Sequence, residues 1–226
     1  MTRCLLLASI LLTAVYAQDV PPPPKPQDSG PSLEATMKFI QDKMNEQDTV
    51  GYAFTQSNLS AETFRVFYRI SDVVADAASC SLKTVETTDT RIEVVPGNTY
   101  SEGGQPVTGE DLSRRKVEKA TIRLRDVESI SVERLQDARN RGFAESAHPE
   151  ITVDIAAPVY VLTLAAPRPV FLFHVTFTRG NGAPKEYDDP SKTDMLQFRD
   201  EDMANRVAKA FVHAVELCGG GRKDPF

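Results

Sequence analysis

The hydrophobic period of this chain changes near residue 49, and that change constrains the fold more than any other feature. Over 49–198, apolar residues recur mainly at every second position, as Val50, Tyr52 and Phe54 do. This is the period of a strand with one buried face, and it is typical of antiparallel sheet. About seven short strands are expected, within 50–54, 64–70, 82–95, 117–124, 127–135, 159–165 and 170–178, with 195–198 as a possible short last strand.

Helical patterns flank this region on both sides. Ser32 is a suitable cap for a helix over about 33–47 with one apolar stripe, formed by Leu33, Met37, Ile40 and Met44. Asp200 predicts the start of a long C-terminal helix that ends at the glycines 219–221. We therefore predict an α+β fold: a bent antiparallel sheet or small, partly open barrel of about seven strands, capped by the long C-terminal helix and preceded by one amphipathic helix.

Three stretches interrupt the strand pattern. Residues 96–113 are rich in Gly, Pro, Ser and acidic residues, have no period and predict a long surface loop. Residues 137–150 are polar and predict irregular structure or a weak helical turn, and 180–192 predict a turn-rich loop.

Part of the chain resembles a pleckstrin-homology-like barrel, over about residues 121–218. The resemblance lies in the strand and turn Ile122–Val127, the hairpin Val159–Thr178 and the entry to the last helix, Phe198–Ala204. The end of that helix, Val212–Gly220, is also similar to uncharacterised exported bacterial proteins, a family that brings no function with it. Members of the barrel family that bind phosphoinositides use Lys and Arg between the first two strands. Here Gln56–Glu62 has no basic residue, so lipid binding is not implied.

The N-terminus predicts export. Arg3 precedes an apolar run that is shorter than the roughly 20 residues of a membrane-spanning helix, and small residues follow at Val15 and Ala17. We expect residues 1–17 to be a signal peptide cleaved between Ala17 and Gln18, which leaves a secreted or periplasmic protein with no transmembrane segment. The remaining division is a proline-rich linker at 18–31, a single α+β domain at 32–221 and a tail at 222–226.

Cysteine count and charge narrow the function further. Only Cys80 and Cys218 remain after cleavage, and an even pair in an oxidising compartment predicts a disulfide. The alternative, a catalytic thiol, would need a nearby base, and His213 is poorly placed on the helix for that role. With 26 basic and 32 acidic residues, the net charge of −6 disfavours binding to nucleic acid.

Few side chains are candidates for a site. Arg114, Arg115 and Lys116 form the densest basic cluster and are a possible contact for a partner, although acidic neighbours also favour a solvated, balanced stretch. The histidines, His148 and His174 besides His213, have no metal-ligand spacing, so no metal or cofactor is predicted.

Three classes of function remain. The first is an exported, non-enzymatic module that binds an unknown protein or peptide. The second is a carrier of a small apolar ligand in the barrel interior, and the third and weakest is a hydrolase. A filled interior between the sheet and the last helix would favour the first class and an open one the second. The side chains that decide this are Phe54, Phe64, Tyr68, Phe171, Phe173 and Phe177.

Overall fold

A computed structural model describes residues 30–102, 104–146 and 148–221. The predicted signal peptide, nearly all of the proline-rich linker and the tail at 222–226 lie outside these residues. Contacts divide the chain into residues 1–30 and residues 31–226, and the fold below is that of the second unit.

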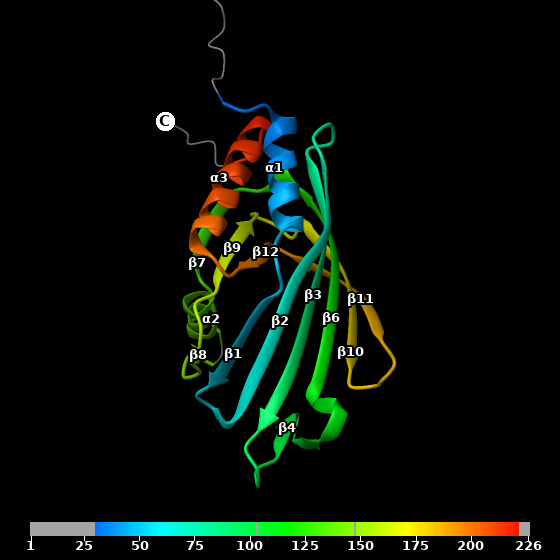
Figure 1. Ribbon diagram of the computed structural model, residues 1–226, viewed down its shortest axis with the longest axis vertical. Coiled ribbons are helices and arrows are strands. Elements are labelled where there is room, and N and C mark those ends of the chain that lie inside the picture. The colour runs from blue at the N-terminus through cyan, green and yellow to red at the C-terminus, as the bar shows by residue number, and fades with distance from the viewer. Residues whose placement is uncertain (1–29, 103, 147, 222–226) are drawn as a thin grey trace, which may run out of the picture. The chain divides into compact units, whose positions relative to one another are not determined.

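The described residues contain three α-helices and twelve strands (Figure 1). In chain order they are α1 (Leu33–Asn45), β1 (Val50–Gln56), β2 (Leu59–Asp76), β3 (Ser81–Val94), β4 (Tyr100–Glu102), β5 (Gln105–Val107), β6 (Ser113–Arg123), β7 (Ser129–Arg134), α2 (Leu135–Ala144), β8 (Val153–Ile155), β9 (Tyr160–Ala165), β10 (Phe171–Arg179), β11 (Lys185–Ser191), β12 (Thr193–Phe198) and α3 (Glu201–Leu217). Two short 3₁₀ turns, η1 (Gly109–Leu112) and η2 (Leu124–Asp126), join strands.

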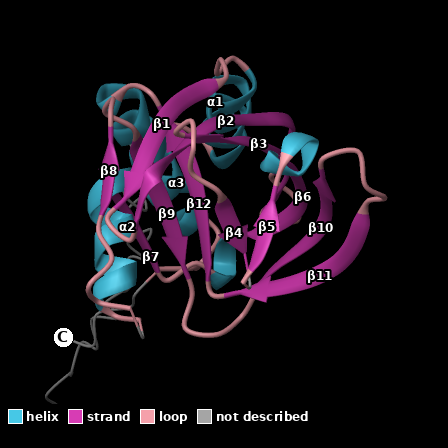
Figure 2. Ribbon diagram, turned by 90° about the horizontal axis from the view of Figure 1, so that it is seen from below, coloured by secondary structure: helices cyan, strands magenta, loops and turns pink. Residues whose placement is uncertain are grey.

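The strands form antiparallel sheets without a closed barrel. The largest sheet has seven strands in the order β11-β10-β6-β3-β2-β1-β8, a second has the order β12-β9-β7, and β4 pairs with β5. Seen from below, the large sheet curves strongly, and its strands follow an arc from β8 to β11 (Figure 2). The prediction of an α+β fold with a bent antiparallel sheet and a C-terminal helix is confirmed, with more strands than expected.

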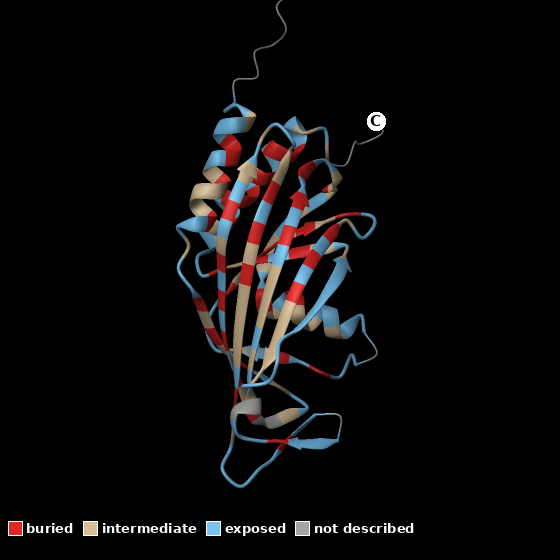
Figure 3. Ribbon diagram, turned by 90° about the vertical axis from the view of Figure 1, so that its right-hand side faces the viewer, coloured by how far each residue is buried: buried red, intermediate tan, exposed pale blue. Residues whose placement is uncertain are grey.

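The apolar core lies where the two long helices meet the sheets. α1 and α3 pack against each other at one end of the large sheet, and α3 also covers β7 and β9 (Figure 1). Val207 and Phe211 of α3 and Leu162 and Leu164 of β9 are completely buried. Removing such side chains from water stabilises the fold by roughly 25 cal/mol for each Å² of apolar surface. Along the large sheet, buried residues alternate with exposed ones, as the two-residue period requires (Figure 3).

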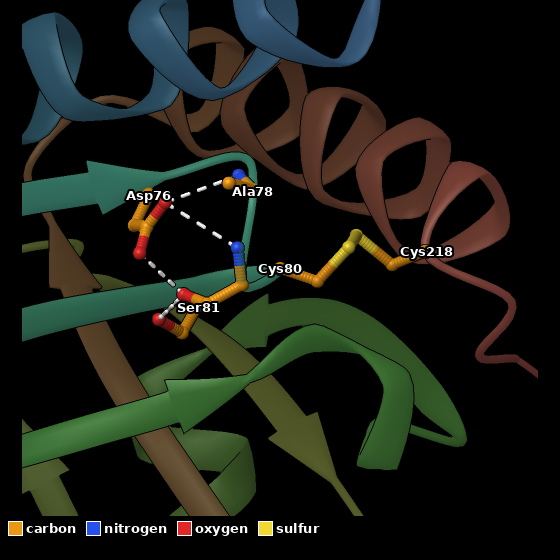
Figure 4. Close-up of a disulfide and its surroundings, with 6 residues drawn as sticks. Asp76, Ala78, Cys80, Ser81 and Cys218 are labelled. Atoms are coloured by element: carbon orange, nitrogen blue, oxygen red, sulfur yellow. Dashed lines mark hydrogen bonds between the residues drawn. A yellow bond between two sulfur atoms is a disulfide. The ribbon is translucent and has the colours of Figure 1, made fainter.

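A disulfide ties the end of α3 to the large sheet. Cys218, at the C-terminal cap of α3, is bonded to Cys80 in the turn between β2 and β3, with the Cα atoms 5.8 Å apart (Figure 4). The side chain of Asp76 orders that turn by accepting hydrogen bonds from the backbone N–H groups of Ala78, at 3.0 Å, and Ser79, at 3.3 Å. The bond joins the elements named by the sequence, the end of the last helix and the segment before the third strand.

The structure corrects three sequence expectations. Residues 96–113 form the β4–β5 hairpin and η1 instead of one long loop, and Tyr100 and Val107 are buried. The polar stretch after residue 134 forms α2, a regular helix. Most of the expected loop 180–192 is β11, an edge strand that pairs only with β10. An edge strand exposed on both faces has no apolar alternation, which explains why the pattern missed it.

Candidate functional site

A cavity of about 610 Å³ opens on the concave side of the large sheet. It lies between this sheet and β12, and no described residue of α3 lines it, so it is not the space between the sheet and the last helix that the sequence left open. Near α3 the interior is filled instead. The lining comes from eight strands and from α2: Tyr52, Phe54, Gln56, Leu59, Phe64, Val66, Tyr68, Glu86, Thr88, Thr90, Tyr100, Arg114, Lys116, Glu118, Arg139, Phe173, Asp189, Ser191, Thr193, Asp194, Met195 and Gln197.

One wall of the cavity is aromatic. Phe54 of β1 stacks on its cross-strand neighbour Phe64 of β2, with ring centroids 4.7 Å apart and planes 8° from parallel. Tyr100 of the β4–β5 hairpin meets Phe64 edge to face at 6.3 Å, and Tyr52 lies 6.4 Å from Phe54. Such a continuous row offers ring faces to an apolar or cationic group.

The neighbouring strands β3 and β6 of the same sheet line the cavity with polar side chains because of the strand register, and these side chains form its polar wall. On the concave face Glu86 of β3 lies directly opposite Glu118 of β6, and the next inward pair is Thr88 with Lys116. Like charges that face each other across a sheet destabilise it. The sheet therefore carries an acidic pair at the cavity, in which the ion pair with Lys116 balances the charge of Glu118.

Glu86 is the most perturbed acid of this wall. Its side chain is buried, and the hydroxyl of Tyr68 donates a hydrogen bond to Oε2 at 2.8 Å. Burial, together with the negative charge of Asp194, raises the pKa of Glu86 well above its usual value, and burial likewise raises the pKa of Tyr68. The other oxygen, Oε1, has no hydrogen-bond partner among the residues that the structure describes.

Asp194 reaches the same wall from β12. Its side chain is buried, and no group in the described part of the chain forms a hydrogen bond with Oδ2. Burial, with the charge of Glu118 adding to it, raises the pKa of Asp194 from 3.8 to about 7. Two buried carboxyl groups whose pKa values are raised by burial therefore line one cavity. Nothing in the local sequence marks either residue, because the pair forms only when β12 crosses the concave face.

The basic cluster of the sequence is split by the pleat of β6. Arg114 and Lys116 line the cavity, whereas Arg115 lies on the outer face, 3.8 Å from Asp89. Lys116 pairs with Glu118 at 2.7 Å. Arg114 donates to the hydroxyl of Tyr100 at 3.1 Å and to Glu102 at 2.9 Å.

A third cation, missed by sequence reasoning, comes from α2. The guanidinium of Arg139 lies 4.9 Å from the ring centroid of Phe54 and donates to the hydroxyl of Tyr52 at 3.4 Å. It was missed because the segment that carries it was expected to be irregular.

The histidines do not contribute to this cavity. Nδ1 of His174 lies 3.1 Å from Asp188, with both side chains exposed on neighbouring strands, and Nδ1 of His148 lies 3.5 Å from Glu150. Nε2 of His213 donates to the carbonyl oxygen of Pro31 at 2.9 Å. Within the described residues, no cluster of three or more His, Cys, Asp or Glu has the arrangement of a metal site.

The aromatic residues named by the sequence divide between cavity and core. Phe54, Phe64, Tyr68 and Phe173 line the cavity, whereas Phe171 is buried outside it and Phe177 is partly exposed. The sequence therefore identified four lining residues but not the acids beside them.

Comparison with known proteins gives no match from which a family could be assigned. No family model matches the chain, and no curated protein or solved structure matches it. The resemblance to a pleckstrin-homology-like barrel stays a prediction. In the part of the chain that the structure describes, none of the helices has the length and apolar character needed to cross a membrane.

Proposed function

We propose that this protein is an exported carrier that binds a small amphipathic molecule in the cavity of its large sheet. The observation that supports this most directly is the cavity itself, which combines an aromatic wall with buried carboxyl groups. Ligand sites in proteins commonly enclose about 300 to 1,000 Å³ and combine an apolar lining with a few polar groups. The cavity, at about 610 Å³, falls inside that range.

The chemistry of the lining modifies the carrier hypothesis drawn from the sequence. A wholly apolar ligand would leave Glu86 and Asp194 buried against hydrocarbon, and burying polar groups without partners is costly. A ligand with an apolar body and a polar end suits both walls. The body would lie against Phe54 and Phe64, and the polar end would lie towards the acids.

The filled space beside α3 is the outcome that favours a protein- or peptide-binding module, but the open cavity beside β12 supports a carrier more directly. Two of the three basic residues suggested as a partner contact, Arg114 and Lys116, line the cavity and already pair with acids. Only Arg115 lies on the outer face, and it faces Asp89 there. A single, partly balanced cation is a weak basis for recognising an acidic partner.

Export is part of the same proposal. A disulfide between Cys80 and Cys218 fits an extracellular or periplasmic location, where such bonds persist. The leader at 1–17 and its cleavage between Ala17 and Gln18 are predictions from the sequence, and N-terminal sequencing of the exported protein would test them.

A pair of variants on one strand tests whether the cavity binds ligands. Thr88 lines the cavity, while its neighbour Thr87 lies on the opposite face of β3. We expect Thr88→Phe to fill the cavity and abolish binding of the neutral fluorescent probe N-phenylnaphthylamine, and Thr87→Phe to leave binding unchanged. Equal binding by both variants, or no binding by the unmodified protein, would contradict the proposal.

A further inference from the structure

The arrangement of donors and acceptors in the cavity identifies the polar end of its ligand. Resting on the proposed function, we infer that the ligand carries a cationic amine, held by Glu86 and Asp194, with its apolar body against the aromatic wall.

When ionised, the carboxyl groups of Glu86 and Asp194 are acceptors only, and the described residues leave buried oxygens of this kind in the cavity without donors. Among the described residues, three buried oxygens without a hydrogen-bond partner belong to side chains that line it: Glu86 Oε1, Asp194 Oδ2 and Gln197 Oε1. Glu86 is only 5% exposed and Asp194 only 2%. Buried polar groups are almost always satisfied, so a set of lone acceptors on one cavity calls for donors. A primary ammonium group supplies three N–H donors and no acceptor.

The cations that line the cavity already contact other acids or an aromatic ring. Lys116, whose charge acts on Glu86, pairs with Glu118, and Arg114 pairs with Glu102. Arg139 lies over the ring of Phe54 on the aromatic wall. No ion pair between described residues neutralises Glu86 or Asp194. A cationic ligand would supply that charge, whereas an anionic ligand would add a third negative charge to this end.

The aromatic wall already holds a positive charge. The guanidinium of Arg139 already occupies a ring face there, at 4.9 Å from the centroid of Phe54. Ring faces attract cations, and desolvation strengthens that attraction. The apolar body of an amine ligand would therefore lie on the aromatic wall, where Arg139 and Arg114 already occupy ring faces, and its ammonium group would lie at the acids.

Binding of an amine should release protons. The groups that face Glu86 are Tyr68 from β2, Glu118 and Lys116 from β6 and Asp194 from β12. Because burial raises the pKa of Asp194 to about 7, the empty protein holds a proton there below that pH, which an ammonium group would displace. Affinity for the amine should therefore rise with pH from about 5 to about 8, as proton competition weakens.

Three probes with one body and different ends test the inference: phenylbutylamine, phenylbutanol and phenylbutyrate. Calorimetric titration of the disulfide-bonded protein at pH 8 should give the tightest binding for the amine and the weakest for the carboxylate. Glu86→Gln should weaken amine binding by about tenfold or more, which is the usual size of one lost charge interaction, and change alcohol binding by less than about twofold. Glu93→Gln, on the same strand but exposed, is the matched control.

The outcomes separate this inference from the proposed function. If the alcohol binds in the cavity and the amine binds no better, or if Glu86→Gln leaves the preference intact, the amine inference is wrong and the carrier proposal stands. If none of the three probes binds at millimolar concentration, the carrier proposal itself fails. We expect a measurable proton release, up to about one proton per amine, in titrations with buffers of different ionisation enthalpy. Such a release distinguishes displacement at the acids from binding at the rings alone. No release would overturn the role of the acids.

Discussion

The carboxyl group of Asp194 should make the protein less stable as pH rises from about 4 to about 7. In the folded chain its pKa is raised from 3.8 to about 7, because it is buried beside other acids. The folded chain therefore keeps a proton that the unfolded chain releases, and the resulting stability is fully present below pH 3.8 and lost as pH rises to about 7. At 1.36 kcal/mol for each pKa unit, the loss is about 4 kcal/mol.

Asp194→Asn tests this by removing the titration while keeping a side chain of the same shape. Compared with the unmodified protein, the variant should gain up to about 4 kcal/mol in the free energy of unfolding between pH 4 and pH 8. Urea unfolding followed by circular dichroism suits the measurement, because the chain has no Trp. Asp154→Asn, at an exposed position of β8, serves as the control and should show no such trend.

If the difference in the free energy of unfolding between Asp194→Asn and the unmodified protein does not change with pH, the prediction is wrong. It would also be refuted if the variant were less stable than the unmodified protein at pH 8. The first result would mean that Asp194 ionises normally in the folded state, and the second that its carboxylate has a partner that the structure does not contain.

Three further changes test the framework that holds the cavity. Replacing Cys80 and Cys218 by Ser opens a loop of 138 residues and should lower the free energy of unfolding by about 2 to 5 kcal/mol in chemical denaturation. Gly220→Ala should lower the melting temperature, because its Cβ would lie 2.6 Å from the carbonyl oxygen of Leu124; an unchanged melting temperature would exclude this close approach. Asp200→Ala removes the side-chain cap of α3 and should cost about 1 kcal/mol, whereas Asp200→Asn should cost less.

The helices and the disulfide were predictable because each follows from a local or countable signal. Ser32 and Asp200 accept the hydrogen bonds expected of helix caps, from the backbone N–H groups of Ala35 and Met203. The disulfide followed from simple pairing, since only two cysteines remain in the predicted mature chain. In each case the signal does not depend on where distant strands lie.

The acidic wall was not predictable from the same patterns. In the third strand the sequence emphasised the apolar positions, including Val85, but the structure buries Thr84 and Glu86 and leaves Val85 only partly covered. The available signal was a two-residue period between Leu82 and Ile92 in which some inward positions are polar. It was ambiguous, because a polar row is expected to face water unless another element covers it. The strand β12, far along the chain, supplies that cover.

The position of the helices explains why one end of the sheet is packed and the other is open. α1 and α3 bring apolar side chains only to the end that holds the disulfide, and their buried residues fill the space there. Further along the strands the inward rows become Glu86 with Glu118 and Thr88 with Lys116, which cannot form a dry core.

Glu86 and Glu118 face each other across the sheet; Lys116 pairs with Glu118 and Tyr68 donates to Glu86, but no ion pair between described residues neutralises the ionised form of Glu86. Glu86→Gln should therefore stabilise the empty protein at pH 8, because it removes a buried acid opposite Glu118. The same change should weaken amine binding. A variant that gains stability and loses its ligand together would indicate that the acids are retained for binding and not for the fold. A loss of both would indicate instead that Glu86, through its bond with Tyr68, mainly holds the sheet together.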